Sequence, residues 1–137
     1  MSRTNRRITL AKRPDGPLSE DDFSEDTVPV PDLADGEILV ETTWLSIDAT
    51  IRTWIAYDTY LPAVRIGDPV RSFGLGTVVE SSSGDIPVGV MVQGQFNWQQ
   101  YAVVRSRDVQ LVPPGTDPEA VLNVFGIAGL TAYFGLL

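Results

Sequence analysis

The segment Glu37-Ile38-Leu39-Val40-Glu41-Thr42-Thr43-Trp44-Leu45-Ser46-Ile47 decides the fold of this chain of 137 residues. It is rich in β-branched and aromatic residues, which favour strands, and it follows the turn signal Asp35-Gly36. It is also the longest strand candidate in the sequence. The chain is therefore expected to fold around strands.

Shorter strand candidates lie on both sides of this segment. Glycine and proline turn signals separate them, and they occupy residues 7–11, 76–80, 88–92, 96–104 and 109–112. Residues 27–31 can be extended but not central in a sheet, because Pro29 and Pro31 each remove a ladder donor. Six or seven short strands followed by helices predict a mainly β fold with short helices, a bent barrel or a sandwich.

Two short helices are predicted within this order. Ser46 or Asp48 can cap a helix that runs from Asp48 to Ala56 and carries Arg52. Residues 116–119, Thr-Asp-Pro-Glu, combine a capping box with a proline in the first turn, and they start a helix that ends near residue 123.

Residues 126–137, Gly-Ile-Ala-Gly-Leu-Thr-Ala-Tyr-Phe-Gly-Leu-Leu, predict a third helix that begins at Gly126. Gly126 and Gly129 leave the backbone bare, so it can approach another surface or a ligand closely. Simple packing is the alternative interpretation, because small residues also let a helix lie close to a sheet.

The composition excludes several classes of function. Cysteine and histidine are absent, so the chain contains no disulfide, thiol nucleophile, imidazole base or Ser-His-Asp triad. Zinc rarely accepts carboxylates alone, so no metal site is expected. The net charge of −8 argues against nucleic-acid binding, and the acidic residues 20–26 are expected to form a solvated surface segment. With no long apolar run and no secretory signal, a cytoplasmic protein that does not cross a membrane is expected.

Five segments carry a family resemblance. They are Leu45-Ser46-Ile47-Asp48 with Arg52, Tyr60-Leu61-Pro62, residues 76–81, Trp98-Gln99-Gln100-Tyr101, and residues 126–137. In this order they resemble the medium-chain dehydrogenases/reductases that lack zinc, in particular the leukotriene B4 12-hydroxydehydrogenase/prostaglandin reductase group of double-bond reductases. The last segment is nearest to the family form, Gly-Met-Pro-Gly-Leu-Thr-Ala-Tyr-x-Gly-Leu-Leu. The resemblance extends over nearly the whole chain.

The resemblance implies a GroES-like bent β-barrel that is incomplete and lacks the Rossmann domain. Residues 1–125 would be the catalytic-domain portion, and residues 126–137 would start the helix that leads to the absent domain. The cofactor implied is NADP(H), bound mainly by residues outside this sequence. No glycine-rich dinucleotide fingerprint is present. Gly74-Leu75-Gly76 is too short to replace it and is interpreted as a bulge or turn in a strand.

The resemblance also assigns roles to single residues. Tyr60 would be the catalytic residue, its phenol bonding to a substrate carbonyl oxygen, and Thr50, Tyr60 and Trp98 would line the substrate pocket. Cofactor contacts would come from Gly126, Ile127 and Thr131. Each has a structural alternative: Tyr60 as a half-buried loop residue, Trp98 as a core anchor, and Thr131 bonding back to its own helix.

Two functions are compatible with these residues. The first is the catalytic-domain portion of an NADPH-dependent oxidoreductase that reduces the C=C bond of α,β-unsaturated carbonyl compounds, with a small-molecule substrate. Residues 1–137 alone are then expected to be inactive. The second is a non-catalytic GroES-like binding or assembly module. Dimers are common in the resembling group, so a homodimer is a further expectation.

Overall fold

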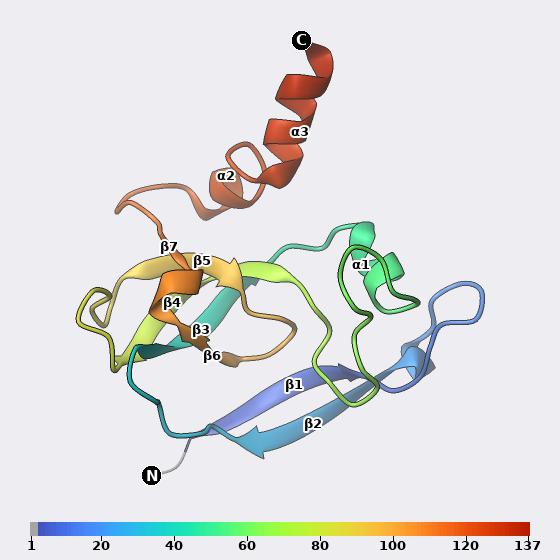
Figure 1. Ribbon diagram of the computed structural model, residues 1–137, viewed down its shortest axis with the longest axis horizontal. Helices are drawn as coiled ribbons and strands as arrows, with labels where there is room; N and C mark the ends of the chain where they lie inside the picture. Colours follow the sequence, from blue (N-terminus) through green and yellow to red (C-terminus); the bar gives the residue numbers. More distant parts are fainter. Residues whose placement is uncertain (1–2) are drawn as a thin grey trace.

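The computed structural model of the protein describes residues 3–137. Its strands form two antiparallel sheets (Figure 1). The smaller sheet pairs β1 (Thr4–Leu10) with β2 (Phe23–Pro29). The larger sheet has the order β6 (Tyr101–Arg105), β3 (Glu37–Leu45), β4 (Phe73–Ser81), β5 (Met91–Gln95) and β7 (Gln110–Leu111). The predicted mainly β class is confirmed, and the two sheets curve without closing into a barrel.

The remaining elements are short. The helices are α1 (Thr50–Trp54), α2 (Pro118–Leu122) and α3 (Ile127–Leu136), and two 3-10 turns are η1 (Glu20–Asp22) and η2 (Ser106–Asp108). All three predicted helices are present, but α1 is shorter than the predicted span 48–56, and its cap position is Ala49 rather than Ser46 or Asp48. The cap of α2 is Asp117 rather than Thr116, because the Asp117 carboxylate accepts the backbone N–H of Glu119 at 3.0 Å.

The predicted long segment becomes β3, which pairs with β4 on one side and β6 on the other. Its register with β4 shifts between Thr42 and Trp44, so β3 bulges where it faces Gly74 and Gly76. A Cβ atom at Gly76 would overlap the Glu41 carbonyl oxygen, so this close approach requires glycine. The interpretation of the Gly74–Gly76 segment as part of an irregular strand is confirmed.

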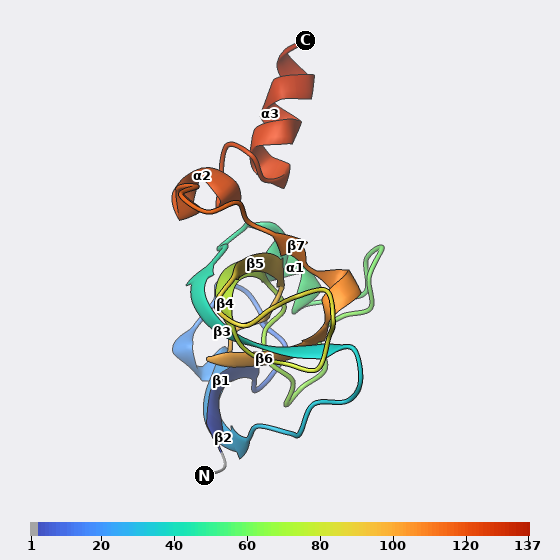
Figure 2. The ribbon, with the colours of Figure 1, turned by 90° about the vertical axis from the view of Figure 1, so that its left-hand side faces the viewer.

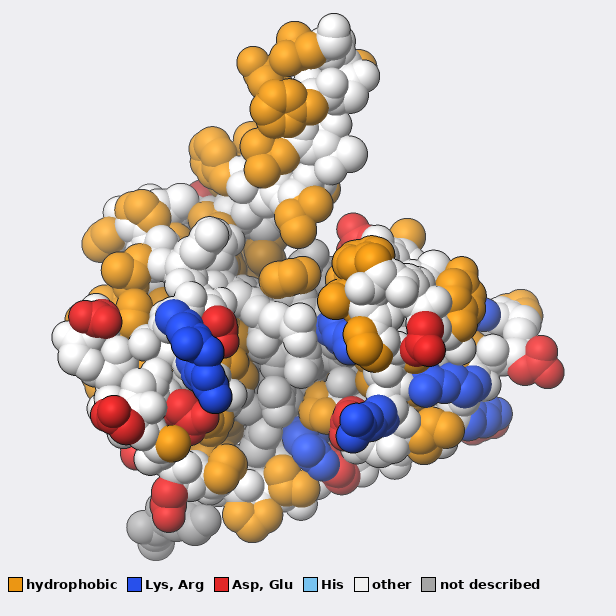
Figure 3. All heavy atoms as spheres, in the orientation of Figure 1, with side chains coloured by type: hydrophobic (Ala, Val, Ile, Leu, Met, Phe, Trp, Pro, Cys, Tyr) orange, Lys and Arg blue, Asp and Glu red, His pale blue; other side chains and the backbone are white. Residues whose placement is uncertain are grey.

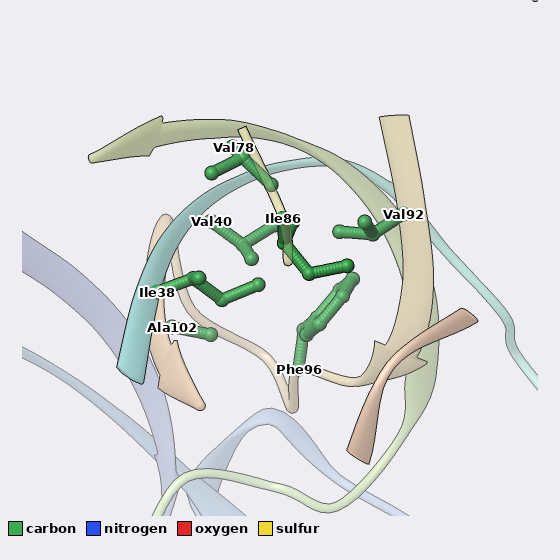
Figure 4. Close-up of a cluster of buried hydrophobic side chains, with 7 residues drawn as sticks. All are labelled: Ile38, Val40, Val78, Ile86, Val92, Phe96 and Ala102. Carbon is green, nitrogen blue, oxygen red and sulfur yellow. The ribbon is translucent and has the colours of Figure 1, made fainter. Parts of the chain in front are cut away.

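The core of the larger sheet is a cluster of seven buried side chains inside its curve (Figure 4). Its members are Ile38, Val40, Val78, Ile86, Val92, Phe96 and Ala102. Ile38 and Val40 lie two residues apart on β3, so they point to the same face of the pleat, as the period of two requires, and β4 adds Val78. This cluster fixes the curvature that carries β3 toward α1.

Two predicted strands are displaced along the chain. The strand predicted at 88–92 is observed at 91–95, because Gly89 has φ +92° and forms a turn. The strand predicted at 96–104 begins only at Tyr101, because Asn97 adopts the left-handed φ of +62°. The first strand covers residues 4–10 rather than 7–11.

The acidic segment is only partly a solvated surface. Glu20 and Asp21 are exposed, but Asp22 is buried, and its carboxylate accepts the backbone N–H of Ser19 at 2.9 Å. Glu25 and Asp26 lie in β2 and pair with Arg6 and Arg7 of β1. Charge pairing across the strands therefore places part of this segment in a sheet.

The helix α3 projects from the body of the molecule in both views (Figures 1 and 2). None of its residues is buried. In the described part of the chain, residues 3–137, no helix is long and apolar enough to span a lipid bilayer.

Candidate functional site

The helix α1 is held to the body by two buried side chains, Ile51 and Trp54. Asp48 precedes it, and its carboxylate accepts the backbone N–H of Thr50 at 2.7 Å and also the Thr50 hydroxyl. These two bonds keep the pKa of Asp48 below its usual value, the hydroxyl bond contributing most. The predicted pocket residue Thr50 thus has its hydroxyl committed to Asp48.

Arg52 on the same helix fixes a neighbouring loop. Its guanidinium donates to the carbonyl oxygen of Gly16 at 2.9 Å. Arg52 therefore ties α1 to the loop that contains Gly16.

The predicted catalytic residue Tyr60 stands at the tip of the loop after α1. Its ring is 77% exposed, so it is not a half-buried loop residue. Its ring stands nearly perpendicular to the Trp54 ring, at 77°, with 6.5 Å between ring centroids. The phenol is therefore open to a ligand while the ring rests on a core side chain.

A groove of about 580 Å³ lies where β1 meets the end of β3 and the turn before β6. It is lined by Arg6, Arg7, Ile8, Thr42, Thr43, Leu45, Ile47, Trp98, Gln99 and Gln100. Of the three predicted pocket residues, Trp98 lines this groove, and Thr50 and Tyr60 are not among its lining residues.

Trp98 is fixed between the two sheets. Its carbonyl accepts the N–H of Ile8 at 2.8 Å, its own N–H donates to Val70 at 2.9 Å, and its ring stacks on Phe23 at 5.6 Å. Within residues 3–137, the buried Nε1 of Trp98 and hydroxyl of Thr42 have no hydrogen-bond partner. Trp98 therefore lines the groove and also packs against the core.

Both groove arginines carry paired charges. Arg7 donates to the two carboxylate oxygens of Asp26 at 2.8 and 2.6 Å, which raises the pKa of Arg7 and lowers that of Asp26. Arg6 pairs with Glu25 at 2.8 Å. The groove is therefore not suited to binding an anion through these two side chains.

One hydrophobic cluster links the α1 region to the groove. Leu10, Ile51, Trp54, Ile55, Val64 and Val70 are buried together, and Phe23, Leu61 and Trp98 pack against them. Thr50 precedes the member Ile51, Tyr60 precedes Leu61, which packs against the cluster, and Trp98 packs against it directly. The three predicted pocket residues are thus positioned by a common core even though they do not share one cavity.

The predicted cofactor contacts lie apart from this cluster, on α3. Gly126 caps the helix, Ile127 is exposed, and the Thr131 hydroxyl donates to the Ile127 carbonyl at 2.8 Å. A Cβ at Gly126 would meet the Leu122 carbonyl at 2.6 Å, so glycine is required there by local packing. Thr131 makes the bond to its own helix that its structural alternative predicted.

Sequence reasoning missed two residues beside Tyr60. Trp54 was not singled out, although an aromatic residue inside a predicted short helix often anchors it to a core. Arg71 was also missed: it donates to the Pro62 carbonyl at 2.9 Å and lies over the Trp54 ring at 5.9 Å. No local sequence signal identifies it, because its partners lie at a distance along the chain.

Comparison with known proteins places these features in a family. The sequence model of a family described as the N-terminal domain of oxidoreductase matches residues 6–112. The NADPH-dependent curcumin reductase of Escherichia coli is 36% identical over 137 residues, which are 97% of this chain and 39% of that protein. Prostaglandin reductase 1 of Bos taurus is 32% identical over 94% of this chain and 39% of its own.

Solved structures with a similar fold are also known. The crystal structure of CurA from Vibrio vulnificus matches with a TM-score of 0.91 and 31% identity, over 97% of this chain and 40% of that one. Its complex with NADPH matches with a TM-score of 0.88. The chain spans about two fifths of the length of these relatives.

Proposed function

Because this chain belongs to the family of oxidoreductase N-terminal domains, in the double-bond reductase group of the medium-chain superfamily, we propose that it is the first part of an NADPH-dependent oxidoreductase. The proposed reaction is reduction of the C=C bond of a small α,β-unsaturated carbonyl compound. Residues 1–125 would supply the substrate side of the active site, and residues 126–137 would lead to a nucleotide-binding domain.

The observation that carries this proposal is the presentation of Tyr60. An exposed phenol on a ring that packs against the buried Trp54 is a hydrogen-bond donor presented at the surface. Such a donor stabilises a carbonyl oxygen on which negative charge develops. Thr50, at the start of α1, and Trp98, in the groove, are proposed to shape the pocket around the substrate.

The residues present fit the nicotinamide end of the cofactor but not its phosphates. A dinucleotide phosphate needs a glycine-rich turn between a strand and a helix. Gly74 and Gly76 lie inside β4, where the β3 backbone fills the space beside them, so they cannot cradle a phosphate. Gly126, Ile127 and Thr131 would therefore contact only the nicotinamide end of the cofactor. The Thr131 hydroxyl oxygen can still accept a hydrogen bond there.

The chemistry follows from this division of roles. NADPH, when bound, would supply the hydride for the β-carbon of the substrate. Tyr60 would hold the carbonyl oxygen while charge develops on it, and the α-carbon would then take a proton from water. Positioning and electrostatic stabilisation by the chain's own groups are the contributions proposed for this domain.

The test starts with the coding sequence that follows Leu137. A continuing Rossmann sequence supports the enzyme, whereas a stop codon supports the non-catalytic module. If it continues, the longer protein is expected to oxidise NADPH in the presence of an enone, and residues 1–137 alone are expected not to. Measurable turnover by residues 1–137 alone would contradict the proposal.

A substitution then tests the role of Tyr60 in the longer protein. We expect Tyr60→Phe to lower kcat by about 100-fold, as loss of a donor to a developing oxyanion does. Tyr57→Phe is the matched control, because Tyr57 is also exposed and lies three residues earlier. Equal activity of the two variants would show that Tyr60 has no catalytic role.

A further inference from the structure

The loop that carries Tyr60 is ordered by its own hydrogen bonds. The Asp58 carboxylate accepts the N–H of Ala63 at 2.8 Å and closes the mouth of the loop. Across the tip, the N–H of Thr59 donates to the Leu61 carbonyl at 2.9 Å. These bonds set the shape of the loop, but both lie within it, so they do not fix its position on the body.

Beside the packing of Leu61 and Tyr60, hydrogen bonds join this loop to the body. The N–H of Val64 donates to the Trp54 carbonyl at 2.8 Å, at the exit of the loop. Nearer the tip, the Arg71 guanidinium donates to the carbonyl of Pro62 at 2.9 Å. Arg71 is thus the side chain that reaches the loop from a different part of the chain.

Arg71 also contacts the ring on which Tyr60 rests. Its guanidinium carbon lies 5.9 Å from the centroid of the Trp54 ring, and the Trp54 ring in turn meets Tyr60. A guanidinium in this place is attracted to the face of an indole. One side chain therefore touches both the loop backbone and the surface that supports the phenol.

The anchor of Arg71 is rigid. Val70 and Ser72 on either side of it are buried, and their carbonyls accept the N–H groups of Trp98 at 2.9 Å and Asn97 at 3.1 Å. The backbone of residue 71 is therefore held between two buried, hydrogen-bonded neighbours. A side chain that starts from a fixed backbone can fix what it binds.

From these contacts we propose that Arg71 is a positioning residue, which holds the Tyr60 loop against Trp54 so that the phenol faces the substrate. The kinetic part of this proposal rests on the proposed function, and the positioning part does not. A donor that is displaced by about 1 Å can cost about 100-fold in rate, so a loop clamp of this kind affects turnover without touching the substrate.

The first test uses residues 1–137 and measures amide hydrogen exchange. Arg71→Met removes the donor and the charge and keeps an aliphatic stem, and we expect at least about 10-fold faster exchange at Thr59, Ala63 and Val64. Arg71→Lys, which keeps the charge, should fall between Arg71→Met and the wild type. Arg65→Met is the matched control, because Arg65 is exposed close to the same loop. Unchanged exchange in Arg71→Met would overturn the proposal.

The second test uses the longer enzyme and a double-mutant cycle. Arg71→Met should lower kcat by about 10-fold with little change in KM, and it should add no further loss to Tyr60→Phe. Losses that multiply would overturn the proposal, because Arg71 would then act independently of Tyr60. If Tyr60→Phe has full activity, the proposed catalytic role of Tyr60 fails, and the exchange experiment alone decides whether Arg71 holds the loop.

Discussion

The helices α1 and α3 differ in how far they are packed against the rest of the molecule. The helix α1 has five residues, and two of them, Ile51 and Trp54, are buried at 6% exposure each. The helix α3 has ten residues, none of them buried, and Leu136 at its end is 88% exposed. Figure 3 shows apolar side chains over the projecting helix. Length and apolar content alone therefore do not decide whether a helix is packed.

The difference teaches which functional residues this chain can position unaided. The side chains near α1 are fixed by a core that the chain builds itself, so Tyr60 has a defined environment. No side chain on α3 is buried, and the Thr131 hydroxyl bonds to the Ile127 carbonyl of its own helix. The relatives are more than twice as long as this chain, and the proposed function places the partner of α3 in their additional residues.

The largest difference between α1 and α3 is expected when one aromatic side chain on each helix is truncated to alanine. Trp54→Ala should lower the free energy of unfolding by about 3–5 kcal/mol, because it empties a buried aromatic site. Phe134→Ala, on α3, should change it by less than about 0.5 kcal/mol. Urea unfolding followed by circular dichroism measures both. Similar costs for the two variants would show that α3 is packed in solution.

A second comparison adds a methyl group instead of removing a ring. Gly76→Ala should destabilise the protein by about 1–3 kcal/mol, because its Cβ would overlap the β3 backbone. Gly135→Ala, on α3, meets nothing within 4 Å, and it should increase helix content because alanine favours a helix by about 1 kcal/mol over glycine. Thermal unfolding and the far-ultraviolet helical signal report the two effects. A stable Gly76→Ala variant would contradict the close approach of β3 and β4.

The smallest expected difference depends on pH. The pKa of Asp48 is lowered in the folded protein, so its stabilising effect is complete above the usual carboxyl value and is lost as the pH falls through the lowered one. Asp48→Ala should cost about 0.5–1 kcal/mol near pH 7, as loss of an exposed hydrogen bond does. This cost should shrink as the pH falls from about 5 to about 2. A cost that stays constant over that range would argue against the bond from Thr50 to an ionised Asp48.

No such dependence is expected for α3, which contains no Asp, Glu, Lys or Arg between Ile127 and Leu136. Far-ultraviolet spectra of a peptide covering residues 123–137 across the same pH range provide the control. A large acid-dependent change in that peptide would show that another group controls the helix.

The sequence predicted β3 and all three helices because their signals are local. The residue types of a strand and the cap of a helix can be identified within a few positions of the sequence. The turns at Gly89 and Asn97 depend on positive φ angles, which these residue types allow but do not require. That is why the strands near them were displaced. The resemblance identified Tyr60 and Trp98 as candidates, but not Arg71, since its contacts with Pro62 and Trp54 arise only from the tertiary fold.

The exposed helix α3 also affects the solubility of residues 1–137. A net charge of −8 keeps copies apart at long range, but that repulsion is screened over about 30 Å at 0.01 M salt and only about 8 Å at 0.15 M. The attraction between exposed apolar helices is not screened by salt. Solubility of residues 1–137 should therefore fall as ionic strength rises, and removal of α3 should abolish that trend.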